Sequence, residues 1–172
     1  MLEHKQLDLV IARFTLDSHR KLFDFQALAP EPLCLVTGSQ HPLAGARELP
    51  LATLGSWPWI VYPAGTPMRA RLERAFAEAG MQTPENTVET SSMQTTLQLL
   101  QTSPMVAMLA ESMVEPDIRA GRLMRLDLPF PLVLADYGII TRRNETPGWS
   151  ALAFIEQMLS GADALRSGRH TP

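Results

Sequence analysis

Residues 57–80 have the sequence WPWIVYPAGTPMRARLERAFAEAG and contain the signals of a strand, a turn and a helix, in that order. The apolar, β-rich run at 57–62 predicts a short buried strand. Prolines and a glycine at 63–67 predict that the strand ends there in a turn. The segment therefore predicts a strand that leads directly into a helix.

The helix expected over 67–79 has a signal at each end. Thr66 can accept a hydrogen bond from a free amide of the first turn, and Pro67 suits the first helical position because it has no N–H to leave unpaired. Gly80 is a typical left-handed cap at the end. The apolar residues at helical spacing are Met68, Leu72, Ala75, Phe76 and Ala79. They predict one buried face.

The same succession recurs along the chain. A short strand at 86–89 precedes Thr90-Ser91-Ser92, whose hydroxyls can cap a helix that carries Leu97 and Leu100. Other predicted strands lie at 7–14, 31–37, 104–109, 122–128 and 132–142. Other predicted helices lie at 111–118, interrupted by Pro116, and from Thr146-Pro147 to Gly161. Strands that alternate with helices predict an α/β fold with mostly parallel sheets, and residues 162–172 a flexible tail.

Composition excludes several classes of protein. With 172 residues, 45% of them hydrophobic, the chain can bury a sizeable core. Its net charge of −3 leaves no basic stripe for nucleic acid. Neither an apolar run of about 20 residues nor a signal-peptide core is present, so we expect a cytoplasmic protein. Cys34, the single cysteine, lies in an apolar run and is interpreted as core packing.

Motifs for catalysis or metal binding are missing from the sequence. The four histidines are His4, His19, His41 and His170. None is three or four residues from another, so we expect no metal site. Glycine-rich phosphate loops and nucleophile elbows are absent too. Asp8 and Asp136 have no base nearby and are interpreted as structural carboxylates. We therefore predict no catalytic residues, no cofactor and no enzyme.

Two helix starts are suited to hold a small anion. They are Pro63-Ala64-Gly65-Thr66-Pro67-Met68-Arg69 and Thr90-Ser91-Ser92-Met93, and both follow strand ends, where free amides and the helix dipole favour negative charge. Arg13, just past the first strand, can add a charge-assisted hydrogen bond. Ordinary capping explains the hydroxyls equally well, and a solvated surface arginine is the alternative for Arg13.

An ordered set of segments resembles one family. The segments are LDLVIAR, EPLCLVTGSQHPLA, WPWIVYPAGTPMR, NTVETSSMQTTLQLL, PMVAMLAESMV, GRLMRLDL and YGIITRR. Over about residues 5–160 they resemble the effector-binding domain of LysR-type bacterial transcription regulators. Within that family the chain is most similar to the branch of sugar-uptake and aromatic-acid catabolism regulators.

The resemblance implies a type II periplasmic-binding-protein fold, with two lobes joined by two crossover strands and an effector in the cleft between them. The first lobe would hold residues 1–45 and 132–161, and the second 46–131. The implied effector contacts are Arg13, Gly65, Thr66, Pro67, Met68, Thr90, Ser91 and Ser92.

The family's winged helix-turn-helix, linker helix and first β-α-β unit have no counterpart here. We therefore expect an incomplete first lobe, and contact with promoter DNA only through the missing N-terminal part. The expected partners are a small anionic effector and a second copy of the chain, in a homo-oligomer. The alternative is a free-standing solute-binding protein of the same fold that serves uptake, and the upstream coding sequence would discriminate between the two.

Overall fold

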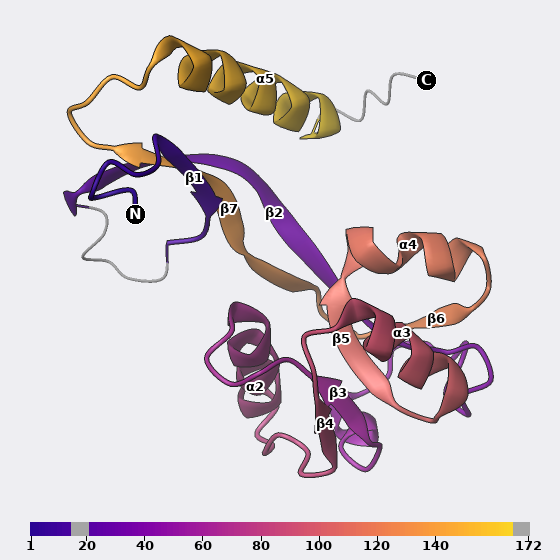
Figure 1. Cartoon of the computed structure of the whole chain (residues 1–172). Helices are drawn as coiled ribbons and strands as arrows, with labels where there is room; N and C mark the ends of the chain where they lie inside the picture. Colours follow the sequence, from indigo (N-terminus) through magenta and orange to yellow (C-terminus); the bar gives the residue numbers. More distant parts are fainter. Residues whose placement is uncertain (15–20, 167–172) are drawn as a thin grey trace. The chain divides into compact units, whose positions relative to one another are not determined.

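The computed structural model describes residues 1–14 and 21–166, which divide into two compact units (Figure 1). The terminal unit comprises Met1–Glu31 and Ala135–Pro172, and the central unit comprises Pro32–Leu134. Two long strands, β2 (Phe23–Gly38) and β7 (Leu132–Arg142), run from one unit into the other. The boundaries implied by the resemblance were near 45 and 132. The first boundary lies earlier because the second half of β2 pairs with strands of the central unit.

The central unit contains a mixed sheet. Strand β3 (Trp59–Val61) pairs in parallel with β4 (Thr87–Glu89) and with β5 (Val106–Ala110). In contrast, β2 pairs antiparallel with β5 and with β6 (Leu123–Leu126). The α/β class is confirmed, but the prediction of mostly parallel sheets is wrong. The relative direction of strands does not appear in a hydrophobic pattern.

Helices cover both faces of this sheet because successive strand residues point to opposite sides (Figure 1). Helices α1 (Leu51–Leu54) and α2 (Pro67–Glu78) share one core cluster with alternate strand residues. Those strand residues are Leu33, Leu35, Trp59, Val61, Val106 and Met108. The intervening residues pack against α3 (Met93–Thr102) and α4 (Glu111–Arg119). These residues are Cys34, Val36, Ile60, Ala107 and Leu109. The predicted core position of Cys34 is confirmed.

Helix α2 begins and ends as its sequence predicts. Thr66 is its N-cap, and Gly80 has a φ of +72° beyond its end. Phe76 is fully buried and meets Trp59 edge to face, with 5.3 Å between the ring centroids. The predicted apolar face is thus confirmed for Leu72, Ala75 and Phe76, which are buried, and for Met68, which packs against the same core. The prediction is wrong for Ala79, which is the C-cap and is exposed.

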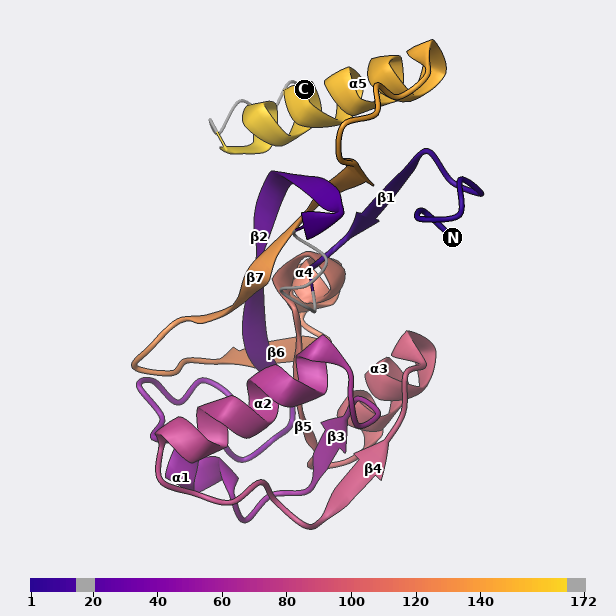
Figure 2. The same ribbon diagram turned by 90° about the vertical axis from the view of Figure 1, so that its left-hand side faces the viewer.

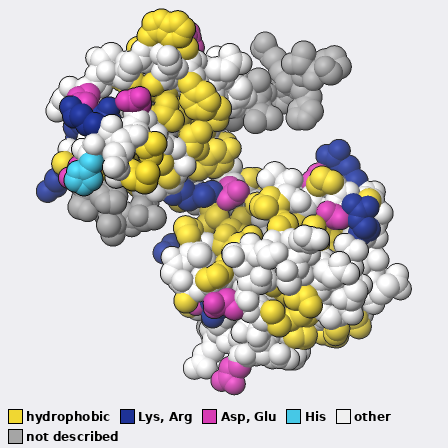
Figure 3. Space-filling model, in the orientation of Figure 1, with side chains coloured by type: hydrophobic (Ala, Val, Ile, Leu, Met, Phe, Trp, Pro, Cys, Tyr) yellow, Lys and Arg dark blue, Asp and Glu magenta, His cyan; other side chains and the backbone are white. Residues whose placement is uncertain are grey.

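Among its described residues, the terminal unit contains strand β1, parts of strands β2 and β7, and helix α5 (Figure 2). Strand β1 (Leu9–Ala12) pairs antiparallel with β7, and β7 pairs with β2. Helix α5 (Trp149–Arg166) packs through Ile155 and Ala162. Strand β1 is not buried on both faces, since Ile11 is 42% exposed. Hydrophobic side chains are visible on the surface around α5 (Figure 3), where Trp149 is 79% exposed.

Two predicted starts and one predicted interruption need correction. Strand β2 starts at Phe23 instead of 31, and the alternation FDFQAL that marks its first half was missed. Pro116 lies within α4 without interrupting it. Helix α5 begins at Trp149, where the Gly148 carbonyl accepts from Leu152 N, instead of at Thr146-Pro147.

Helix α5 also continues past Gly161 to Arg166, because Ala162 packs in the core of the terminal unit. The predicted tail is therefore wrong for 162–166, and 167–172 lie outside the described residues. Within the part of the chain that the structure describes, no helix combines the length and hydropathy needed to cross a membrane.

Candidate functional site

The candidate site lies where the neighbouring strands β3 and β4 end in the central unit. Val61 and Glu89 are register partners, and Thr90 N donates to Val61 O over 3.0 Å. The arrowheads of both strands point the same way in Figure 2. Because parallel strands end at the same edge of a sheet, the loops that lead to α2 and α3 leave from adjacent positions.

At the start of α2, Thr66 is both donor and acceptor. Its Oγ1 donates to Pro63 O over 2.8 Å and accepts from Arg69 N over 3.3 Å. Gly65 has a φ of +81°, and a side chain there would be strained. Since Pro67 has no N–H, Met68 carries the one first-turn amide that lacks an intrahelical or capping acceptor.

The start of α3 has more free donors. Ser92 Oγ accepts from Thr95 N over 3.3 Å, and Thr90 Oγ1 accepts from Ser92 N over 3.1 Å. The amides of Met93 and Gln94 precede the capped one and have no intrahelical acceptor. Ser91 and Ser92 are exposed, so this helix start is open to a ligand. The predicted caps are thus confirmed. Met93 closed the second predicted anion site, but neither Met93 nor Gln94 was among the predicted effector contacts.

Arg69, the last residue of the first predicted anion site, is a cation that was not among the predicted effector contacts. Its backbone amide caps on Thr66, and its Nε lies 2.7 Å from Glu73 Oε1. The i,i+4 spacing of the two residues was the available signal. The ion pair neutralises part of the positive field at the start of α2, so an anionic ligand would compete with Glu73 for Arg69.

Arg13 belongs to the terminal unit, whereas the other seven predicted contacts belong to the central unit. Its Nη2 lies 2.6 Å from Glu31 Oε2, and its Nε donates to Ala135 O over 2.8 Å. The guanidinium also lies over the Tyr137 ring, 5.6 Å from its centroid. With a side chain 21% exposed, Arg13 is an ion-paired residue and not a freely solvated one.

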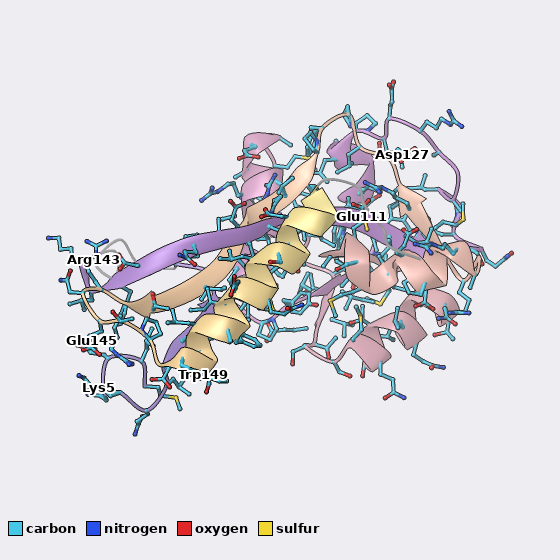
Figure 4. All side chains as sticks on the ribbon, turned by 90° about the horizontal axis from the view of Figure 1, so that it is seen from above. Lys5, Glu111, Asp127, Arg143, Glu145 and Trp149 are labelled. Atoms are coloured by element: carbon cyan, nitrogen blue, oxygen red, sulfur yellow. The ribbon has the colours of Figure 1, made fainter. Side chains whose placement is uncertain are left out.

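Several of the ionisable groups that could support catalysis or metal binding are buried or ion-paired. Burial raises the pKa of the Cys34 thiol to about 11, so it is protonated at neutral pH. Asp8 pairs with Arg142, and Lys5 with Glu145 over 3.0 Å (Figure 4). No group of three metal-ligating side chains occurs in 1–14 and 21–166, and His19 and His170 lie outside these ranges.

Residues 1–163 match the family described as the LysR substrate binding domain. The chain belongs to this family. The match covers nearly all described residues, and it agrees with the resemblance noted in the sequence.

The related sequences are named as transcription regulators. The chain is 31% identical over 108 residues to the HTH-type transcriptional regulator GbpR of Rhizobium radiobacter, covering 63% of this chain and 36% of that protein. It is 25% identical over 162 residues to the RuBisCO operon transcriptional regulator of Allochromatium vinosum, covering 94% and 53%. The chain therefore spans about one third to one half of these relatives.

Solved LysR effector domains have the same fold. The regulatory domain of Synechocystis CcmR in complex with 2-PG has a TM-score of 0.79 at 16% identity, over 94% of this chain and 76% of that one. The effector-binding domain of QuiR in complex with shikimate has a TM-score of 0.72 at 17% identity, over 94% and 75%. The predicted fold is thus confirmed, and the chain is the effector-binding domain of a LysR-type regulator. The relatives favour this function over the alternative of a free-standing uptake protein.

Proposed function

We propose that this LysR effector domain binds a small anionic metabolite at the starts of α2 and α3. One observation carries the proposal: the loops that lead to the two helices leave from adjacent positions, at the ends of the paired strands β3 and β4. Helix N-termini attract anions through free amides and the helix dipole. The strand ends of α/β sheets are also where ligands commonly bind.

The donors divide into three kinds. The backbone amides of Met68, Met93 and Gln94 point along their helices and can donate to carboxylate or phosphate oxygens. The hydroxyls of Thr66, Thr90, Ser91 and Ser92 add side-chain groups, and Gly65 and Pro67 shape the loop. Arg13 remains a proposed effector contact, for which the effector would have to compete with Glu31.

The rest of the proposal concerns the full-length regulator. We place it in the cytoplasm, where it binds promoter DNA through a segment outside this chain. It acts without a cofactor and without enzymatic activity. It forms a homo-oligomer, which light scattering would detect as a mass above that of one chain. The effector shifts the population of its conformations.

Pairs of charged and neutral ligands test the proposal. A panel of small carboxylates and phosphates, each with its neutral amide or alcohol, is titrated into the ¹⁵N-labelled protein. We expect the charged member of at least one pair to bind, with the largest amide shifts at Met68, Met93 and Gln94. If every bound anion instead shifts amides elsewhere, the helix starts are caps and not a binding site.

A further inference from the structure

A second hollow of the central unit lies on the side of α2. It measures about 280 Å³ and is lined by Arg71, Ala75, Glu78, Ala79, Phe130 and Pro131. Three of these residues lie at helical spacing on α2, and Ala79 is its C-cap. The other two belong to the loop from β6 to β7 that begins at Asp127 (Figure 4). We call this hollow the α2 slot. None of its lining residues is among the effector contacts proposed above.

Arg71 is an incompletely paired cation in this slot. Its side chain is only 16% exposed, and its Nε donates to Val133 O over 3.2 Å. Its Nη1 lies 3.6 Å from Glu78 Oε2, beyond hydrogen-bond distance. Among the described residues, no other acceptor reaches this buried Nη1. A buried charged donor without an acceptor is costly, so an oxygen that reaches Nη1 would be strongly favoured.

The remaining walls of the slot are apolar and small. Ala75 is 2% exposed, and the Phe130 ring is 36% exposed beside Pro131. The short side chains of Ala75 and Ala79 leave the space open between Arg71 and the ring. Glu78 lies at the rim, with its side chain 59% exposed, where it can move aside. A buried cation at one end of an apolar slot complements a molecule with an anionic head and an apolar body.

We propose that the α2 slot is a second ligand site, which takes a small carboxylate with an apolar body. The carboxylate accepts from Arg71 and displaces Glu78 as its ionic partner, while the apolar body packs on Ala75, Phe130 and Pro131. The volume falls just below the usual range of small-molecule pockets, about 300–1,000 Å³, and so limits the ligand to a small one. The slot does not depend on the site at the helix starts.

Phenylacetate and its neutral counterpart phenylacetamide are suitable probes. In titrations of the ¹⁵N-labelled chain, we expect phenylacetate to shift the amides of Ala75, Ala79 and Phe130 in a saturable way. The amide should bind roughly ten- to a hundred-fold more weakly, because it cannot form the charge-assisted hydrogen bond. Equal binding of the two probes, or no shifts in the slot at about 10 mM, would overturn the proposal.

Two variants and a matched control localise the binding. Arg71→Gln should weaken phenylacetate binding roughly ten- to a hundred-fold, whereas Arg74→Gln, the same change on an exposed part of α2, should leave it within about twofold. Glu78→Gln should strengthen binding a few-fold because it removes the competing carboxylate. A loss of fold cannot produce such a gain. Unchanged affinity in both Arg71→Gln and Glu78→Gln would show that the slot does not hold the carboxylate.

Thr66→Ala separates this proposal from the proposed function. Phenylacetate binding that survives Thr66→Ala but not Arg71→Gln supports the slot, whatever becomes of the helix-start site. Binding that Thr66→Ala removes and Arg71→Gln leaves intact assigns the anion to the helix starts. That result overturns the slot and supports the proposed function.

Discussion

Thr90 N donates to Val61 O over 3.0 Å and so ties the end of β4 to the end of β3. This hydrogen bond extends the ladder in which Val61 and Glu89 are partners. The loops to α2 and α3 therefore start from a common point. The proposed site would use the dipoles of both helices, and each hydroxyl cap there has both a structural role and a proposed ligand-binding role.

Substitution of the caps distinguishes the two roles. Thr66→Ala and Ser92→Ala should each lower the free energy of unfolding by about 1 kcal/mol through the lost cap. If the hydroxyls also bind the effector, affinity should fall roughly ten- to a hundred-fold, as calorimetric titration would measure. Thr102→Ala is the control, because it removes a hydroxyl at the opposite end of α3 that donates to Gln98 O. Unchanged affinity with lower melting temperatures would leave only the capping role.

The chain by itself should not bind promoter DNA specifically. Its net charge is −3, so it lacks the excess of cations that phosphate contacts require. In an electrophoretic shift at moderate salt, we expect no difference between a promoter fragment and a scrambled fragment of equal length. Sequence-specific retardation by residues 1–172 would contradict this prediction.

Phe76 should be among the most sensitive core positions. It is fully buried and in edge-to-face contact with Trp59, so Phe76→Ala leaves a cavity and should cost about 3–5 kcal/mol of unfolding free energy. Phe154→Ala is the control, since Phe154 is 47% exposed and should cost less than about 1 kcal/mol. Urea denaturation of both variants measures the difference. Equal losses of unfolding free energy in the two variants would contradict the prediction that the buried ring of Phe76 contributes more to stability than the exposed ring of Phe154.

His41 should make the stability depend on pH. Burial lowers the pKa of this residue, whose Nδ1 accepts from Leu43 N over 3.0 Å and whose ring lies 4.3 Å from Trp57. Between the lowered folded pKa and the ordinary value of about 6.5, the unfolded chain binds more protons. Stability should therefore be complete above about pH 6.5 and should fall as the pH decreases through this window.

The matched variant is His41→Gln, which cannot become charged. Its unfolding free energy should change less than that of the parent protein between about pH 5 and 7, even if it is lower throughout. Urea titrations at several pH values give both curves. Parallel curves would assign the pH dependence to other groups.

The prediction from sequence succeeded where local chemistry determines the structure. Helix α2 begins after Thr66 and ends before Gly80, as predicted. Strand β7 spans the predicted residues 132–142. The prediction failed where contacts between residues far apart in the sequence determine the structure. Ala162 keeps α5 helical beyond Gly161 because it packs on Leu28 and Ile139 of other strands.

The candidate site shows the same division. The capping hydroxyls of Thr66 and Ser92 could be predicted, because their partners are three residues away. The pairing of Arg13 with Glu31 could not, since it depends on how β2 and β7 lie beside each other. The amides of Met93 and Gln94 lack intrahelical acceptors because they lie in the first turn of α3. No residue type in the sequence identifies such amides.

Cys34 has a practical consequence. It is 2% exposed, its thiol has a pKa raised to about 11, and the chain has no other cysteine. Maleimide dyes react with accessible thiolates, so the native protein should remain unlabelled. A cysteine placed at the exposed Ser91 would then be the sole point of dye attachment. Fluorescence from that position would report ligand arrival beside the starts of α2 and α3, without removal of any native residue from the core.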